Sequence, residues 1–167
     1  MKHRYTLERS KLQDAEDVHK GAHKGTVMFV MLNPSTADGT KNDATLRRCV
    51  SFATDWGYDH LVVTNLFSLR ATKPDDLWSK TGPARNDERN DDWIEHHAHR
   101  ADTVVCAWGA FQKAVPRAHE VLQLLRDKGH KLVYTIGDLS QSGHPRHPLR
   151  IPSGTLLHGW RGYQGTP

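Results

Sequence analysis

The stretch TVMFVMLN, residues 26–33, decides the fold, because it is a continuous apolar run that ends in a polar turn. A strand with one solvated face alternates apolar and polar residues, whereas a short continuous run is typical of a strand buried on both faces. Three further runs have this character: HLVVTNLF (60–67), DTVVCAWG (102–109) and KLVYTIG (131–137). The four runs predict the parallel strands of a sheet that is covered on both sides.

Helical patterns lie between these strands. In DATLRRCVSFATDWG (43–57), apolar residues recur every three or four positions, with Asp43 placed as the N-cap and Gly57 as the C-terminal stop. A polar helix is expected over 84–100 and a third over about 111–128, where Pro116 either kinks the helix or lies in its true first turn. The alternation predicts an α/β fold, three-layer α/β/α with a central mostly parallel sheet.

The two ends of the chain are less regular. RYTLER (4–9) is predicted as an edge strand, residues 11–25 as a polar loop or short helix, and the tail 152–167 as one more short strand. At 167 residues and 37% hydrophobic content, the chain suits one compact domain over 1–167, with 1–25 and 152–167 peripheral.

Composition narrows the partners and the compartment. The formal charge of +4 permits an anionic partner such as a nucleotide or a nucleic acid without demanding one. No run approaches the roughly 18 apolar residues of a membrane span, and the N-terminus lacks the apolar core of a signal peptide. We therefore expect a cytoplasmic protein with no membrane partner.

Polar side chains gather where three of the predicted strands end. Ligands of parallel α/β sheets bind beyond the carboxyl ends of the strands, so these loops are where a site is expected. Amides, imidazoles and arginines there can recognise a small polar ligand, move a proton or bind a phosphate. The candidates are Asn33, Pro34, Ser35, Thr36 and Asp38 after the first strand, Asn65 and Arg70 after the second, and His144, Arg146, His147 and Arg150 after the fourth.

Each candidate also has a structural interpretation. The two asparagines can shape turns by bonding their own backbone. Asp43 is favoured as a helix cap, whereas Asp38 can orient water as a general base. Arg47 and Arg48, near the start of the first helix, can reach a phosphate or remain solvated.

Several enzyme classes lack their signatures in this sequence. No P-loop or Rossmann glycine-rich loop occurs, and no Gly-x-Ser-x-Gly elbow, which argues against a kinase, an NAD-dependent dehydrogenase and a serine hydrolase. His96 and His99 can share a helix face, but without cysteine or paired acidic ligands a solvated face is favoured over a metal site. Cys49 and Cys106 lack metal-binding or redox spacing and are expected as core thiols. We expect neither a metal nor a cofactor.

A series of motifs resembles an uncharacterised bacterial and phage family, the domain of unknown function 1643. The motifs are MLNPSTAD, DATLRRC, FATDWGY, VTNLFSLRAT, GPARND, VVCAWG and GHPRHPL, in this order over roughly residues 25–150. The order of the LeuAsnPro, ThrAsnLeu, AlaTrpGly and HisProLeu segments is also similar to the uracil-DNA glycosylase superfamily, especially its mismatch-specific branch. This likeness implies a uracil-DNA glycosylase-like fold.

The distant resemblance also implies roles for particular residues. Asn33 would orient the attacking water or cradle the base, and His147, with His144 as a second candidate, would stabilise the departing base. Asn65 would bond the base edge, and arginines would hold phosphate. This sequence departs from the superfamily where Ser35-Thr36-Ala37-Asp38 replaces its usual Gly or Tyr, and in the spacing of the late motif, which puts water placement and strand insertion in doubt.

Three functions stay open on the sequence. The first is hydrolysis of the N-glycosidic bond of a base in DNA or in a nucleotide. The second is a noncatalytic nucleotide or nucleic-acid binding module on the same fold, and the third is an unrelated small-molecule enzyme that uses Asp38 and His147 as an acid–base pair. If DNA is the substrate, Arg47, Arg48, Arg70, Arg146 and Arg150 should form one phosphate-binding rim.

Overall fold

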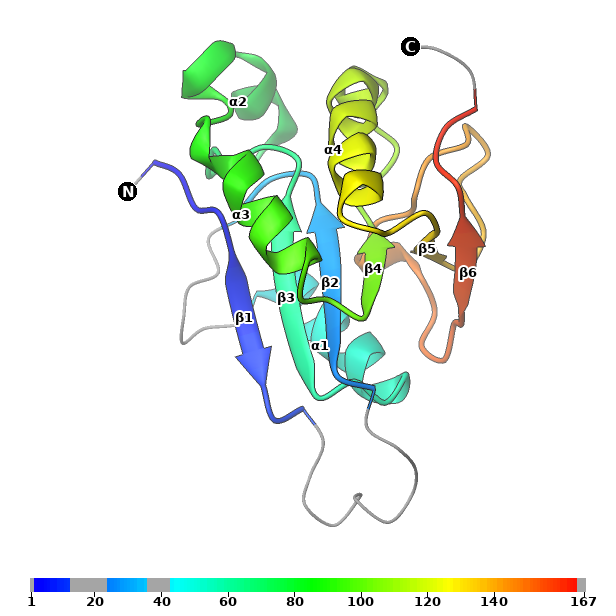
Figure 1. The fold of residues 1–167 in the computed structure, drawn as a ribbon. Coiled ribbons are helices and arrows are strands. Elements are labelled where there is room, and N and C mark those ends of the chain that lie inside the picture. Colours follow the sequence, from blue (N-terminus) through cyan, green and yellow to red (C-terminus); the bar gives the residue numbers. More distant parts are fainter. Residues whose placement is uncertain (1, 13–23, 36–42, 165–167) are drawn as a thin grey trace.

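Six strands form one sheet in the order β1-β3-β2-β4-β5-β6 (Figure 1). The structure is a computed structural model and describes residues 2–12, 24–35 and 43–164. The strands are β1 (Leu7–Ser10), β2 (Thr26–Met31), β3 (His60–Asn65), β4 (Thr103–Cys106), β5 (Val133–Ile136) and β6 (Leu157–Trp160). All four predicted inner strands are present, and the expected edge strand and tail strand lie at opposite edges of the sheet (Figure 1).

The inner part of the sheet is parallel and its edges are antiparallel. β3, β2, β4 and β5 run in one direction, with Val27 opposite Leu61 of β3 and Thr103 of β4. β1 pairs antiparallel with β3, and β6 pairs antiparallel with β5. The sheet is therefore mostly parallel, as the continuous apolar runs predicted.

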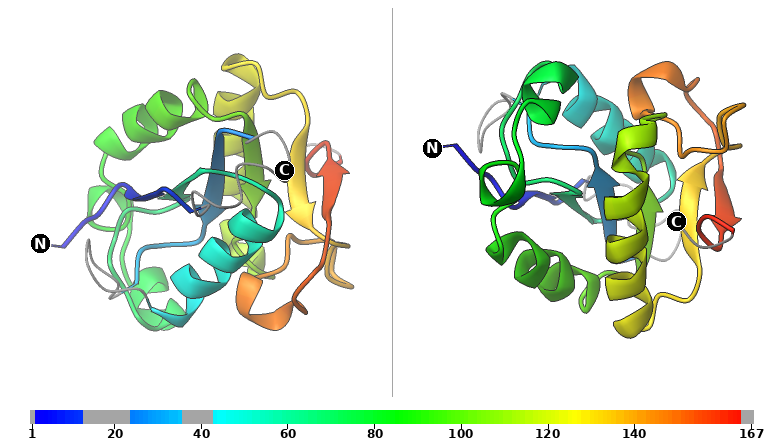
Figure 2. Two further views of the ribbon diagram at one scale, coloured as in Figure 1. Left: turned by 90° about the horizontal axis from the view of Figure 1, so that it is seen from below. Right: turned by 90° about the horizontal axis from the view of Figure 1, so that it is seen from above.

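Helices cover both faces of this sheet. α1 (Ala44–Asp55) lies on one face, and α3 (Arg89–Ala98) and α4 (Val115–Asp127) lie on the other (Figure 2). Asp43 caps α1 as predicted, because its carboxylate accepts the backbone N–H of Leu46 at 2.8 Å. Pro116 is the second residue of α4, which selects the first-turn interpretation over a kink.

The helices are shorter than the sequence patterns suggested. A 3-10 turn, η2 (Gly82–Ala84), precedes α3, and another, η3 (Gln112–Ala114), precedes α4. A short helix that the sequence did not predict, α2 (Pro74–Trp78), follows β3, and a last 3-10 turn, η4 (Pro148–Arg150), follows β5. α2 has only five residues, too few for a periodic apolar pattern to show.

Two hydrophobic cores result from the alternation of side chains along β2. Met28 and Val30 pack on the side of α3 and α4, while Val27 and Phe29 pack on the side of α1, and all four are fully buried. This double burial explains why β2 is apolar from Val27 to Met31. The described part of the chain contains no helix long and apolar enough to cross a membrane.

The strand order creates a switch point at the centre of the sheet. From β2 the chain passes to β3 on one side, and from β3 it returns across β2 to β4 on the other side. The loops that leave β2 and β4 therefore diverge to opposite faces, which opens a crevice at the carboxyl ends of these strands. This crevice is the expected position of a ligand site.

Candidate functional site

A pocket of about 220 Å³ occupies the crevice at the switch point. Three of the predicted loops meet there, since Asn33, Asn65 and His147 all line the same pocket. The other lining groups include Pro34 and Ser35 from the loop after β2, Asp43 and Thr45 at the start of α1, Trp108 and Phe111 after β4, and Arg4 from the N-terminal segment. The sheet edge thus brings together residues that lie more than a hundred positions apart in the sequence.

Asn65 has a buried side chain that makes no hydrogen bond to any residue that the structure describes. It is the last residue of β3 and is 3% exposed. Its backbone carbonyl accepts the amide of Asn90 at 3.0 Å, which holds the end of the strand in place. Buried amides are almost always hydrogen-bonded. The Asn65 amide is therefore available to a water molecule or a ligand in the pocket.

Asn33 has a different environment. Its side-chain Nδ2 donates to the carbonyl oxygens of Ala71 at 2.8 Å, Pro34 at 3.1 Å and Leu69 at 3.3 Å. These bonds tie the loop after β2 to the loop after β3. The turn interpretation of Asn33 is therefore correct for its Nδ2, while Oδ1 accepts no hydrogen bond from the described residues and remains able to hold a water or a ligand.

His147 presents one ring nitrogen to the backbone and leaves the other for the pocket. Its Nδ1 accepts the backbone N–H of Leu149 at 3.3 Å, which places the proton of the neutral ring on Nε2. Burial lowers the pKa of His147 and nearby Arg150 lowers it further, while Asp43 opposes both. At neutral pH His147 is therefore an uncharged ring whose Nε2–H can donate.

Asp43 and Ser35 form the polar floor on the α1 side. The hydroxyl of Ser35 donates to Oδ2 of Asp43 in a short hydrogen bond, and Oδ1 of the same carboxylate caps α1. Both oxygens of Asp43 are thus engaged, which fits its role as a helix cap.

Aromatic rings form the wall on the β4 side. Trp108 is fully buried yet lines the pocket, and Phe111 follows it after Gly109. Gly109 has φ +87°, and a Cβ atom there would lie 3.1 Å from the Phe111 ring and 3.7 Å from Cβ of His147. Only glycine therefore allows this close approach of aromatic ring, backbone and imidazole.

His144 lies outside the pocket lining, in a buried hydrogen-bond chain. The indole Nε1–H of Trp108 donates to the Tyr163 hydroxyl at 3.1 Å, and that hydroxyl lies 3.0 Å from Nδ1 of His144. The indole can only donate, so the Tyr163 oxygen accepts from it, and the Tyr163 O–H remains available for the hydrogen bond with Nδ1 of His144. Burial raises the pKa of Tyr163 to about 12 and lowers that of His144, so both are neutral supports of the wall.

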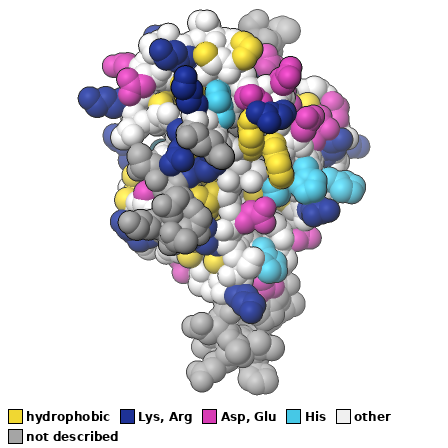
Figure 3. All heavy atoms as spheres, turned by 90° about the vertical axis from the view of Figure 1, so that its left-hand side faces the viewer, with side chains coloured by type: hydrophobic (Ala, Val, Ile, Leu, Met, Phe, Trp, Pro, Cys, Tyr) yellow, Lys and Arg dark blue, Asp and Glu magenta, His cyan; other side chains and the backbone are white. Residues whose placement is uncertain are grey.

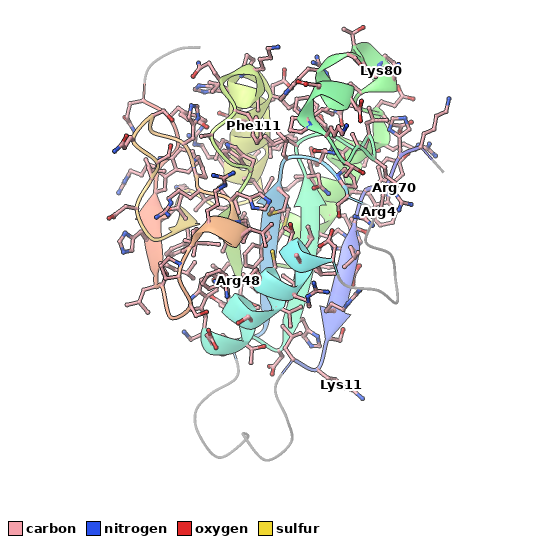
Figure 4. The ribbon with its side chains drawn as sticks, turned by 180° about the vertical axis from the view of Figure 1, so that it is seen from behind. Arg4, Lys11, Arg48, Arg70, Lys80 and Phe111 are labelled. Carbon is pink, nitrogen blue, oxygen red and sulfur yellow. The ribbon has the colours of Figure 1, made fainter. Side chains whose placement is uncertain are left out.

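The predicted arginines do not form one rim. Arg48 donates to the Ile151 carbonyl and the Ser153 hydroxyl and packs 4.5 Å over the Phe52 ring, and Arg146 donates to the Arg150 carbonyl. Figure 4 places Arg48 on one side of α1 and Arg70 on the other, near Arg4. Arg47 lies on the exposed surface of α1.

Two of the predicted site residues, Thr36 and Asp38, lie outside the described residues. Their expected roles stay predictions.

The histidines of α3 form an aromatic surface cluster. Trp93, 40% exposed, stacks on His97 and meets His96 edge-on, and Tyr5 stacks on its other side. Figure 3 shows hydrophobic side chains beside histidines on this face. No group of three metal-ligating side chains occurs among the described residues. His96 and His99, for which a solvated face was predicted, are both exposed, whereas the neighbouring His97 is buried against Trp93.

Sequence reasoning missed the aromatic half of the site. Trp108, Phe111 and Arg4 were not among the candidates, although all three line the pocket. Gly109, between Trp108 and Phe111, is the signal in the sequence that could have indicated a close approach of side chains at this loop. Cys49 and Cys106 are buried thiols, as predicted.

Comparison with known proteins gives one match. No curated protein and no solved structure matches the chain. A family model described as "Protein of unknown function (DUF1643)" matches residues 4–149, which include every described element of the pocket. The chain therefore belongs to the DUF1643 family.

Proposed function

We propose that the pocket binds the base of a nucleotide, in DNA or free, and that the protein hydrolyses the N-glycosidic bond of that base. The observation that carries this proposal is the Asn65 amide, 97% buried and without a partner among the described residues. An amide offers a donor and an acceptor side by side, which is the pattern that the edge of a nucleobase complements.

The rest of the pocket suits a small planar ligand. Trp108 and Phe111 provide apolar and aromatic surface against which a flat ring can lie. A volume of about 220 Å³ is below that of pockets for drug-sized ligands and fits a single base. The motif order shared with the uracil-DNA glycosylase superfamily supports the same class of ligand.

The chemistry requires little from the protein beyond placement. Water attacks the anomeric carbon, the carbon–nitrogen bond breaks, and its electron pair goes to the base, which then takes the proton lost by the water. Oδ1 of Asn33 orients the water, and the Nε2–H of His147 hydrogen-bonds the charge that develops on the base. A neutral imidazole can serve as this donor because its Nε2–H hydrogen-bonds the anionic base without forming an ion pair that would slow release of the base.

Release of free base is the test. The wild type, Asn65→Ala and His147→Ala are incubated with nucleotides and with oligonucleotides that carry uracil, mismatched or modified bases. Loss of the His147 donor should lower the rate roughly 100-fold or more. Arg100→Gln, an exposed change just after the end of α3, serves as the control and should release base at the wild-type rate. No release from any substrate would reject hydrolysis.

A noncatalytic nucleotide-binding module is the second candidate. It is favoured by the engagement of Asn33 Nδ2 and both oxygens of Asp43 in bonds that hold the fold together. Such a module would bind a nucleotide with an affinity that Asn65→Ala weakens, and it would never release base. The separation of Arg48 from Arg70 favours a free nucleotide or a short strand over a long duplex for either candidate (Figure 4).

A further inference from the structure

A second cleft, of about 370 Å³, lies beside the pocket on the face that carries α3 and α4. Arg85 and Asn86, which follow η2, form one wall, and Lys113 of η3 and Arg117 of α4 form the other. Arg85 and Asn86 belong to the motif GPARND, which the function proposed above does not use. The side chains of this cleft are therefore considered separately from those of the pocket.

The Arg85 guanidinium is held in place by aromatic rings and not by a carboxylate of the described residues. Its guanidinium lies 5.2 Å from the centre of the Phe67 ring and 5.9 Å from that of Trp78. Within the described part of the chain, this guanidinium makes no hydrogen bond and no ion pair. The rings fix its plane through cation–π contacts, so its N–H donors stay available for a ligand in the cleft.

The neighbouring groups add further hydrogen-bond donors. Oδ1 of Asn86 accepts from the Ser68 backbone N–H at 3.2 Å and from Asn90 at 2.9 Å, which leaves the amide N–H groups of Asn86 for the cleft. Lys113 is exposed and forms no ion pair with a described residue. A set made of a guanidinium, an ammonium and an amide N–H suits an anion.

Arg117, the third cation of the cleft, is opposed by two carboxylates, so this group of three carries one net negative charge. Arg117 is mostly buried and bonds Asp91, Glu120 at 2.9 Å and the Leu66 carbonyl at 2.9 Å. Glu120, the carboxylate that lines the cleft, is therefore paired with Arg117. Arg85 and Lys113 form no ion pair with a described residue, so the cleft keeps a net positive charge even with the second carboxylate counted.

A row of aromatic rings connects the cleft to the base pocket: Phe67 lines the cleft, Phe111 lines the pocket, and Trp78 contacts both. The Trp78 ring contacts Arg85 on one side, and its centre lies 6.4 Å from that of Phe111, which lines the pocket. Lys113 follows Phe111 by two residues, and Phe111 stands above α1 in the view of Figure 4. A ligand that reaches from one site to the other passes over these two rings.

We propose that this cleft is a phosphate-binding site in which Arg85, Asn86 and Lys113 hold the anion. The assignment of an anion stands on the geometry of the cleft, whereas its connection to the base pocket rests on the function proposed above. The phosphate comes either from the nucleotide whose base occupies the pocket or from a neighbouring phosphodiester of the same strand.

The first experiment uses inorganic phosphate and the whole chain labelled with ¹⁵N. Phosphate should shift the backbone amide signals of Arg85, Asn86 and Lys113 to saturation, whereas chloride at equal ionic strength should not. Arg85→Gln and Lys113→Gln should each weaken phosphate binding about tenfold or more, since each removes a charge-assisted bond. Arg100→Gln and Lys131→Gln, matched exposed changes elsewhere, should leave it unchanged. Equal binding by all variants, or shifts confined to another face, would overturn the site.

The second experiment identifies the source of the phosphate. A nucleoside, its 5′-monophosphate and a short oligonucleotide are titrated into the same variants. If Arg85→Gln weakens the monophosphate and not the nucleoside, the phosphate belongs to the bound nucleotide, and if it weakens only the oligonucleotide, it belongs to the strand. If inorganic phosphate binds but no nucleotide responds, the connection to the base pocket is wrong. Failure of base release with phosphate binding intact would refute hydrolysis alone.

Discussion

Replacement of Asn65 by leucine separates a ligand-binding role from a structural one. Leucine has nearly the shape of asparagine but no polar atoms, and the Asn65 amide has no partner among the described residues to lose. A buried polar group without a partner costs roughly 1–3 kcal/mol, and water in the pocket offsets part of this cost. Asn65→Leu should therefore raise the free energy of unfolding by about 1 kcal/mol, which raises Tm by roughly 2–4 °C in a chain of this size.

Asn90→Leu is the matched control, because Asn90 is fully buried and lies against the same strand end. Its Nδ2 donates to the Asn65 carbonyl at 3.0 Å, to the Leu66 carbonyl at 3.4 Å and to Asn86 at 2.9 Å. Loss of these bonds should lower the free energy of unfolding by at least about 2 kcal/mol.

Urea denaturation of both variants, followed by tryptophan fluorescence, measures the difference. Base or nucleotide binding should fall roughly 5- to 150-fold in Asn65→Leu, the equivalent of about 1–3 kcal/mol for two lost hydrogen bonds. If Asn65→Leu lost as much stability as Asn90→Leu, the amide would have a structural role and its assignment to a ligand would fail.

Three further outcomes follow from the geometry of the site. Asp43→Ala should destabilise the fold by about 1 kcal/mol through loss of the α1 cap, and urea denaturation with unchanged stability would contradict the cap. Gly109→Ala should cost about 1–2 kcal/mol because φ is +87°, and should shift the ring signals of Phe111 in NMR spectra, with Gly129→Ala as the control of like conformation and open space. Folding should lower the pKa of His144 and His147, so the unfolded chain binds more protons and stability should fall as the pH drops below about 6.5. Denaturation midpoints at pH 7.5 and 5.5 measure this, and a smaller loss in His147→Gln identifies its share.

The elements that could be predicted are those whose residues carry the information locally. β2 is apolar from Val27 to Met31 because both of its faces are covered, and a continuous run of this kind is visible in the sequence. α1 shows its cap, its apolar spacing and its terminal glycine within fifteen residues. α2 escaped prediction because five residues are too few for periodicity, and its formation depends on Leu77 entering the core.

The candidate site divides in the same way. The sequence indicated Asn33, Asn65 and His147 because ligands of parallel α/β sheets bind beyond the carboxyl ends of the strands, where these polar residues lie. All three line one pocket. The rim expected from five arginines did not form, since Arg48 and Arg146 satisfy carbonyl oxygens of nearby segments. A side chain's partner is a property of the folded surface, which spacing along the chain does not encode.

By itself, the sequence determined the class of the fold, the order of its strands and helices along the chain, and the loops that hold polar side chains. These follow from burial, periodicity and capping, which act between near neighbours. Only the tertiary structure decided the order of strands in the sheet, which puts β2 between β3 and β4 and opens the crevice. It also decided how the two amides differ, because hydrogen-bond partners come from segments brought together by folding. Asn33 bonds carbonyl oxygens of the loop after β3, whereas the Asn65 amide has no partner among the described residues.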